Sequence, residues 1–283
     1  MRELHERADT WRCGSKIFKI DRHHPLIMGI LNVTPDSFSD GGTHNGLEDA
    51  VAWARRMHDE GAHIIDVGGE STRPGFDETG VTLEEELRRV IPVVERLVKE
   101  GFIVSVDSSK PEIMTEVAAL GAHILNDIRG FEMPGAMEAA AATDCGLVVM
   151  HRSFTTDYED VVADVERYLQ ERQRRLEALG VSADRICWDP GFGFGKTVEQ
   201  NFQLLGTTDR FVASGQPYLM GLSRKSSIGA ATGQKAPLDR IVGSVAGALL
   251  AVQQGAQVVR VHDCRQTADA IAVWRASEEA CGR

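Results

Sequence analysis

The sequence has no cysteine pattern of the kind that builds disulfides or zinc sites. Its five cysteines are odd in number and include no Cys-x-x-Cys pair and no Cys/His ligand spacing. This pattern is typical of reduced thiols, so it predicts a cytoplasmic protein in which the cysteines pack as small hydrophobic side chains.

Two further features are missing: an apolar run long enough to cross a membrane, and an excess of basic residues. No stretch reaches the roughly 18 apolar residues that a membrane span requires, and the formal net charge is -11. Nucleic acids and membrane surfaces attract basic proteins, so we expect neither as a partner. Small anionic substrates stay compatible with this charge, because they respond to the charges that line their site.

No linker, low-complexity tract or charge block divides the 283 residues, which favours one barrel-sized domain. Eight short runs rich in Ile, Val and Leu recur along the chain, at residues 26–33, 63–69, 103–107, 123–128, 147–151, 186–190, 218–223 and 258–263. Nearly continuous apolar runs separated by helical patterns are typical of buried parallel strands. They predict an α/β fold, a single (β/α)8 TIM barrel over residues 26–283, preceded by an N-terminal extension (1–25) that forms a strand or hairpin. A doubly wound open sheet is the alternative.

Capping residues mark the helix boundaries between these runs. Thr82 to Glu85 fits a capping box, and Pro111 suits the first turn of a helix. Glycines that suit left-handed caps precede most strands, at Gly61, Gly101, Gly121, Gly146, Gly180, Gly215 and Gly255. Three of them, at 61, 121 and 255, begin the phrase Gly-Ala-x followed by two apolar residues, which indicates a weak repeat.

The segment DPGFGFGKT, residues 189–197, ends like a phosphate-binding P-loop but does not match one. The P-loop requires glycine at the position of Pro190, and the three glycines also miss the dinucleotide-binding spacing. We interpret Asp189 as the functional residue here and the glycines as sites of close backbone approach. Lys196 is then secondary.

Polar residues follow nearly every predicted strand. The strand C-termini of a TIM barrel line the mouth of the active site, which predicts a rim that contains Asn32, Asp66, residues 70–73, Asp107, Asn126, Asp127, His151, Asp189, residues 223–226, Arg260 and His262. This mixture of carboxylates, carboxamides and cations suits a ligand with a polar heterocycle at one end and an anion at the other. A diphosphate is one such anion, and it often binds with Mg²⁺.

Seven motifs at these strand ends resemble those of dihydropteroate synthase, in the same order over residues 26–263. They are MGILNVTPDSFSDGG (28–42), GGESTRPG (68–75), SVDSSKPE (105–112), NDI (126–128), DPGFGFGK (189–196), GLSRKSSIG (221–229) and RVHD (260–263). The resemblance implies a folate-pathway transferase of a pterinylmethyl group on a TIM barrel. Its small-molecule substrates would be 6-hydroxymethyl-7,8-dihydropterin diphosphate and 4-aminobenzoate, and its products 7,8-dihydropteroate and diphosphate.

The resemblance also implies roles for individual residues. The pterin would be held by Asp107, Asn126, Asp189 and Lys225. The diphosphate would contact Thr72, Arg260 and His262, and Asn32 would ligate its Mg²⁺. The aminobenzoate would lie against Thr72, Arg73 and Ser226. Asp107, Lys225 and Arg73 would be the catalytic residues, and the family resemblance suggests a homodimer through the outer helices and inhibition by sulfonamides.

The mechanism that this resemblance implies follows from the leaving group. Diphosphate would depart before the weakly basic arylamine attacks, and Asp107 would stabilise the resulting pterin methylene cation. The loops at residues 33–42 and 70–75 would close over the reactants and exclude water.

The segment after His151 departs from the family pattern. A longer loop is usual there, whereas this chain passes quickly through residues 152–159 into a helical pattern. The rim would therefore be more open, or Arg152 would supply a new contact. Two other functions stay open at this point: a divergent pterin-binding paralogue with weak or altered arylamine specificity, and a pterin-dependent methyltransferase. A non-enzymatic binding protein is a weaker third.

Overall fold

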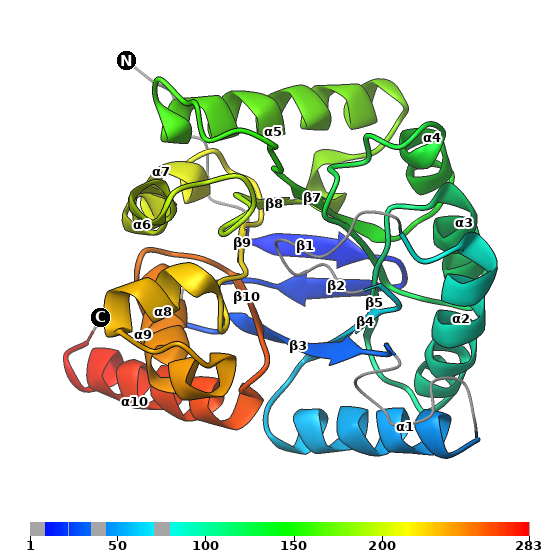
Figure 1. Ribbon diagram of the computed structural model, residues 1–283, viewed down its shortest axis with the longest axis horizontal. Coiled ribbons are helices and arrows are strands. Elements are labelled where there is room, and N and C mark those ends of the chain that lie inside the picture. The colour runs from blue at the N-terminus through cyan, green and yellow to red at the C-terminus, as the bar shows by residue number, and fades with distance from the viewer. Residues whose placement is uncertain (1–8, 22, 35–43, 71–79, 283) are drawn as a thin grey trace.

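Eight parallel strands form a barrel at the centre of the molecule (Figure 1). The computed structural model describes residues 9–21, 23–34, 44–70 and 80–282. The barrel strands are β3 (Leu26–Asn32), β4 (Ile64–Gly68), β5 (Val104–Asp107), β6 (Ile124–Asp127), β7 (Gly146–Met150), β8 (Ile186–Asp189), β9 (Leu219–Met220) and β10 (Val258–Val261). They pair in the order β8-β7-β6-β5-β4-β3-β10-β9, and a parallel bridge between Trp188 and Tyr218 joins β8 to β9. The predicted (β/α)8 barrel is confirmed.

Helices surround this ring of strands (Figure 1). They are α1 (His44–Asp59), α2 (Leu83–Lys99), α3 (Pro111–Ala119), α4 (Ala136–Ala141), α5 (Val161–Ala178), α6 (Val198–Gly206), α7 (Thr208–Val212), α8 (Ser226–Thr232), α9 (Ile241–Gln253) and α10 (Cys264–Ala280). Short 3₁₀ turns lie at η1 (Ala183–Arg185) and η2 (Pro237–Arg240). Among the described residues, no helix combines the length and apolar character needed to cross a membrane.

The interior of the barrel consists of an apolar layer below a polar one. Successive side chains of a strand point to opposite faces, and the lower inward positions carry Leu26, Met28, Ile64, Ile124, Val148, Cys187, Leu219 and Val258, all buried in one cluster. The outward positions pack against the helices in a second, larger cluster. The upper inward positions are polar. The polar groups inside the barrel therefore lie at the carboxyl ends of the strands.

An antiparallel hairpin, β1 (Thr10–Cys13) and β2 (Lys16–Lys19), lies in the N-terminal extension. Trp11, Cys13 and Ile20 join the apolar layer inside the barrel, and the Trp11 indole Nε1 donates to the carbonyl oxygen of Arg185 at 3.0 Å. The hairpin therefore seals the end of the barrel opposite the polar layer, which leaves one open mouth.

One predicted helix cap is wrong. Gly61, Gly101, Gly121, Gly180, Gly215 and Gly255 have the positive φ of left-handed caps, but Gly146 is the first residue of β7. A Cβ at Gly146 would lie 2.5 Å from the Cys13 sulfur and 3.1 Å from the Arg12 carbonyl oxygen. Glycine is present there because the hairpin approaches β7 closely.

The third position of the Gly-Ala-x repeat has a structural role at the closed end of the barrel. The ring Nδ1 of His63 accepts from the backbone N–H of Ile27 at 3.0 Å, and that of His123 accepts from Val104 at 3.3 Å. Gln257 does the same with its side-chain oxygen, which accepts from the N–H of Tyr218 at 2.9 Å. In each case the residue just before one strand uses its side chain to accept from a backbone N–H at the start of the neighbouring strand.

Candidate active site

The polar layer brings together predicted rim residues from six of the eight barrel strands. Asn32, Asp66, Asp107, Asn126 and Asp189 come from β3, β4, β5, β6 and β8. Arg260 comes from β10, on the same face of the strand as His262 just beyond it. All except Asn32, Arg260 and His262 are buried. Parallel strands deliver these groups to one place because their carboxyl ends meet at one end of the barrel.

Arg260 joins two carboxylates at the centre of this layer. Its Nε donates to Asp66 Oδ2 at 2.6 Å, and its Nη2 donates to Asp107 Oδ2 at 2.8 Å. Asn126 Nδ2 also donates to Asp66 Oδ2, at 3.2 Å. Asp66 was predicted on the rim but given no role, and its position in the apolar run HIIDVGG was the signal that a charge is buried there.

Three buried oxygens in this layer have no hydrogen-bond partner among the described residues: Asp66 Oδ1, Asp107 Oδ1 and Ser105 Oγ. Leaving a buried acceptor unpaired costs about 1–3 kcal/mol. Buried polar groups are nearly always satisfied in native proteins. These oxygens therefore indicate a site that is completed by a ligand with hydrogen-bond donors.

Burial changes the ionisation of this layer. It raises the pKa of Asp107 to about 7, with Arg260 opposing the rise and Asp66 adding to it. The pKa of Asp189 is also raised by burial and is lowered in turn by Lys225. Burial alone would lower the pKa of Arg260, but Asp66 and Asp107 raise it above its usual value. The centre thus holds a permanent cation beside a carboxyl group that titrates near neutrality.

Lys225 lies over the loop that follows β8. Its Nζ donates to the carbonyl oxygen of Phe192 at 2.5 Å and lies 4.5 Å from the centre of the Phe194 ring. Burial lowers its pKa to about 8, and Asp189 partly offsets this effect. Asp189 itself accepts from the backbone N–H of Gly191 at 2.7 Å. The two residues therefore lie close enough for each charge to influence the pKa of the other.

The β9–α8 turn has a defined conformation around Arg224. This residue has φ of 58°, which is uncommon for a residue other than glycine. Its guanidinium donates to both oxygens of Asp263, at 2.5 and 3.0 Å, and its backbone N–H donates to Ser244 Oγ at 2.8 Å. The turn is thus held in the conformation that places Lys225 at the barrel mouth.

The remaining predicted residues lie around this centre. The His262 ring Nδ1 is 3.0 Å from Ser223 Oγ, which also accepts from the His262 backbone N–H at 3.2 Å. Ser226 is the exposed first residue of α8, directly after Lys225. Thr72 and Arg73 lie outside the described residues.

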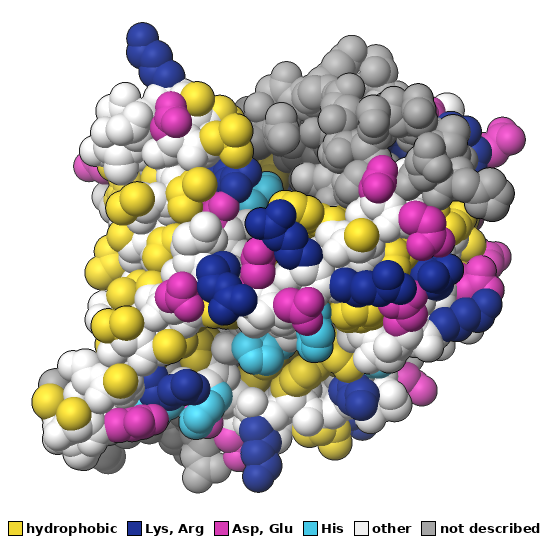
Figure 2. Space-filling view, turned by 90° about the horizontal axis from the view of Figure 1, so that it is seen from below, with side chains coloured by type: hydrophobic (Ala, Val, Ile, Leu, Met, Phe, Trp, Pro, Cys, Tyr) yellow, Lys and Arg dark blue, Asp and Glu magenta, His cyan; other side chains and the backbone are white. Residues whose placement is uncertain are grey.

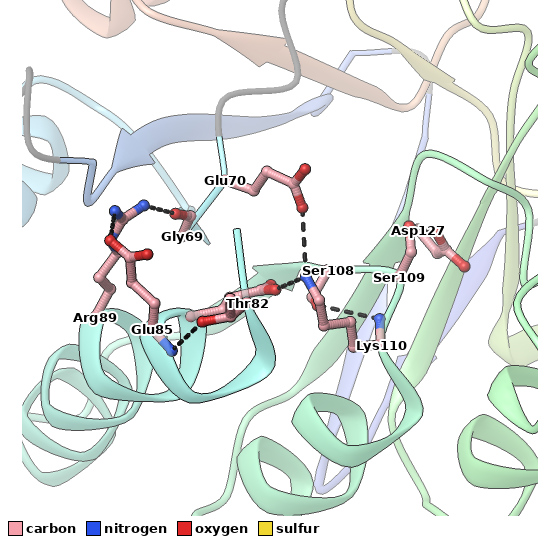
Figure 3. A network of polar contacts seen from close by, with 10 residues as sticks. Gly69, Glu70, Thr82, Glu85, Arg89, Ser108, Ser109, Lys110 and Asp127 are labelled. Atoms are coloured by element: carbon pink, nitrogen blue, oxygen red, sulfur yellow. Dashed lines mark hydrogen bonds and ion pairs between the residues drawn. The ribbon is translucent and has the colours of Figure 1, made fainter. Parts of the chain in front are cut away.

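A polar network lies beside the mouth, between the ends of β4 and β5 (Figure 3). Lys110 Nζ pairs with the buried carboxylate of Glu86 and lies 3.4 Å from Glu70 Oε2. Arg89 donates to the carbonyl oxygen of Gly69 at 2.9 Å. These contacts connect the chain just after β4 to α2 and to the segment that follows Asp107.

Asp127 faces away from the polar layer and has a structural role. Its carboxylate accepts from the backbone N–H groups of Arg129 and Phe131, each at 2.8 Å. It also accepts from Ser109 Oγ, which lies beside it in Figure 3. These bonds give the backbone N–H groups of the turn after β6 an acceptor. Its neighbour Asn126 is the residue of that strand that reaches the centre.

The connection from β7 to α5 packs on the loop after β8. Tyr158 OH donates to the carbonyl oxygen of Gly195 at 3.1 Å, and Gln200 Nε2 donates to that of Thr156 at 2.9 Å. The Arg152 guanidinium lies over the Phe154 ring at 4.7 Å. The predicted contact of Arg152 with a substrate stays a prediction.

Comparison with known proteins places this geometry in a family. The pterin binding enzyme family matches residues 28–262. The dihydropteroate synthase of Escherichia coli (strain K12) is 49% identical over 266 residues, which cover 91% of this chain and 93% of that protein. The chain belongs to the dihydropteroate synthase family. The match over nearly the whole of that enzyme favours a synthase over a pterin-dependent methyltransferase.

Solved structures of dihydropteroate synthases have the same fold. That of Xanthomonas albilineans with 4-aminobenzoic acid superposes with a TM-score of 0.90 at 49% identity, over 96% of this chain and 98% of that one. The same organism's enzyme in complex with 7,8-dihydropteroate gives a TM-score of 0.86 at 47% identity, over 96% and 99%. The dihydropteroate synthase fold thus accounts for the whole described barrel.

Proposed function

We propose that this chain condenses 6-hydroxymethyl-7,8-dihydropterin diphosphate with 4-aminobenzoate, and that the polar layer of the barrel holds the pterin. The observation that carries the proposal is the unpaired, buried Asp107 Oδ1 beside Arg260. A pterin presents adjacent N–H donors along its edge, which carboxylate and carboxamide oxygens accept. Asp107, Asn126 and Asp189 supply such oxygens, and Lys225 supplies a cation for a ring carbonyl or nitrogen.

The bond changes of this reaction need little acid–base chemistry. The bond between the pterin methylene carbon and the diphosphate oxygen breaks, and the amine nitrogen of 4-aminobenzoate then bonds to that carbon and loses a proton. The developing positive charge on the pterin is stabilised by the carboxylate of Asp107, which acts strongly because it is buried. Asp107 is only 4% exposed, so water is largely excluded from it.

Arg260, His262 and Thr72 are assigned to the diphosphate, and Asn32 to its Mg²⁺. Arg260 donates from Nε and Nη2 to carboxylates, and its further N–H groups are proposed to donate to the anion. His262 lies beside it, with its ring oriented by Ser223. Thr72 and Arg73 are assigned to the diphosphate and the aminobenzoate by resemblance, and Ser226 to the aminobenzoate carboxylate.

Asn32 is the residue proposed to ligate Mg²⁺. The described residues include no group of three His, Cys, Asp or Glu side chains that could hold a metal ion by themselves. A site that supplies one oxygen ligand, with water and substrate phosphates as the others, suits Mg²⁺. The ion would neutralise charge on the departing diphosphate.

We further propose a homodimer through α9 and α10. The exposed stripe of α9 carries Val242 and Leu250, which are 82% and 50% exposed, and α10 carries Val273, 73% exposed. Figure 2 shows apolar side chains along the left edge of the molecule, the side on which α8 to α10 lie in Figure 1. Exposed apolar patches of this kind are typical of protein interfaces.

A direct assay tests the proposed activity. The chain is incubated with the pterin diphosphate, 4-aminobenzoate and Mg²⁺, and both diphosphate and 7,8-dihydropteroate are measured. We expect equal amounts of the two products, loss of activity with a metal chelator, and inhibition by sulfonamides that competes with 4-aminobenzoate. Binding of the pterin diphosphate without product would favour the paralogue with altered arylamine specificity.

Asn32 has its own test. Asn32→Ala is expected to raise the Mg²⁺ concentration required for half-maximal activity, because it removes a ligand. An unchanged Mg²⁺ dependence would remove Asn32 from the metal site.

A further inference from the structure

Lys196 is a buried lysine whose amino group is surrounded by protein acceptors, and burial lowers its pKa to about 7. Its Nζ donates to the carbonyl oxygens of Gly191 and Phe194, each at 2.9 Å, and lies 3.0 Å from the ring Nδ1 of His151. In its protonated form this group has three donors and no acceptor. Three close acceptors therefore satisfy it, which leaves no donor to bind a ligand.

His151 takes the acceptor role in this contact. Burial, with the charge of Lys196 as the second cause, lowers the pKa of His151 to about 3. The ring is therefore neutral, and its Nδ1 lone pair faces the ammonium. The ring packs against that of Tyr168 in an edge-to-face arrangement, with centroids 4.9 Å apart. His151 thus offers Lys196 a fixed acceptor from the end of β7.

The loop at residues 191–195, which Lys196 closes, leaves no room for a side chain at two of its glycines. A Cβ at Gly191 would overlap the carbonyl group of His151, and one at Gly195 would overlap that of Ser153. The backbone N–H of Gly193 donates to Asn201 Oδ1 at 2.6 Å. The loop is therefore packed directly on the chain after β7, with Lys196 bonded to both of its halves.

This loop is also the surface on which Lys225 rests. The Phe192 carbonyl accepts from Lys225 Nζ, the Phe194 ring lies over the same atom, and a Cβ at Gly193 would lie 2.9 Å from Lys225 Cδ. The N–H of Gly191 donates to Asp189. Both charged residues assigned to the pterin thus depend on the conformation of residues 191–195.

We propose that Lys196 is a positioning residue, which holds the loop at residues 191–195 so that Lys225 and Asp189 are aligned for the pterin. This inference rests on the proposed function, because it assumes that Lys225 binds the pterin. Lys196, the lysine of the Gly-Lys-Thr that ends DPGFGFGKT, then acts inside the protein, whereas the exposed Thr197 caps α6.

A double-mutant cycle tests whether Lys196 acts through Lys225. We would measure the affinity of Lys196→Met, Lys225→Met and the double variant for the pterin diphosphate with Mg²⁺ by calorimetry. We expect each single variant to bind about tenfold more weakly, which corresponds to about 1.4 kcal/mol. The double variant should bind as Lys225→Met does, because residues that act together are not additive. Lys235→Met, at an exposed lysine, is the matched control and should bind normally.

The outcomes separate the inference from the proposed function. Additive losses in the double variant would overturn the positioning role and leave the role of Lys225 intact. Normal binding by Lys225→Met would overturn the role of Lys225 and the inference with it.

If Lys196→Met does not fold, His151 supplies a second test. His151→Gln keeps an acceptor for Lys196, whereas His151→Leu removes it. The inference requires that the Leu variant binds the pterin diphosphate more weakly and that the Gln variant retains affinity; equal affinities would contradict it.

Discussion

At the scale of single residues, Asp107 combines a high pKa with an unpaired oxygen. Burial brings its pKa to about 7, and its Oδ1 has no partner among the described residues. A carboxylate that burial destabilises gains most from a positively charged ligand. This is the property that stabilisation of a pterin methylene cation requires.

Asp107→Asn should lower turnover far more than it lowers stability. The folded-state pKa is raised, so the contribution of Asp107 to stability is present below its unfolded pKa and is lost as pH rises through about 7. At pH 8 the ionised carboxylate therefore destabilises the fold, and we expect the Asn variant to be at least as stable as the wild type. We expect its turnover to fall by about 10²-fold or more. Steady-state kinetics and thermal unfolding at pH 8 check both parts, and normal turnover would remove Asp107 from the mechanism.

The activity of the wild type should decline on the acid side of neutrality. Asp107 acts as a carboxylate, and protonation near its pKa of about 7 removes its negative charge. We expect kcat/KM for the pterin diphosphate to fall as pH decreases through about 7. A profile that stays level from pH 8 to pH 5.5 would contradict an ionised Asp107.

At the scale of elements, the strands were predictable and their contacts were not. All eight barrel strands were predicted from apolar runs, because strands buried on both faces are apolar throughout. The Gly146 cap was predicted wrongly. A glycine before an apolar run can be a helix cap, but it can also be a strand residue that another segment approaches closely, as the hairpin approaches Gly146. The Gly-Ala-x repeat was visible, but the bonds of its third residue depend on the neighbouring strand.

The repeat predicts matched effects at His63 and Gln257. His63→Leu should lower the free energy of unfolding by about 1–3 kcal/mol at pH 7, because the backbone N–H of Ile27 loses its acceptor. Gln257→Leu should have a similar effect through Tyr218. Urea denaturation measures both, and an unchanged stability of the two variants would show that these bonds do not contribute.

The two positions should differ in pH dependence. Burial, and secondarily His58, lowers the folded-state pKa of His63 below 6.5. Its contribution to stability is therefore present above 6.5 and is lost as pH falls towards the folded-state pKa. His63→Asn, which keeps an acceptor and does not titrate, should lose less stability than the wild type between pH 7 and pH 5. Equal losses would exclude His63 as a source of the pH dependence.

At the scale of the whole molecule, the apolar stripe of α9 predicts the assembly. Val242→Glu should produce a monomer at concentrations where the wild type is a dimer, because it buries a charge in the proposed interface. Analytical ultracentrifugation measures this, with Val198→Glu, on the exposed start of α6, as the control. A wild type that sediments as a monomer would disprove the dimer.

The sequence by itself determined the barrel, the rim and the family. Strand burial and helix caps can be read from a few neighbouring residues. Each of the seven motifs is also a short segment, and together they contain the site residues. Only the tertiary structure decided how these residues are paired. Arg260 binds Asp66, 194 positions away, and Lys196 binds His151, 45 positions away. Such pairs depend on which strands become neighbours and on which face each side chain occupies, so no local pattern could show that both cations are already engaged by protein groups.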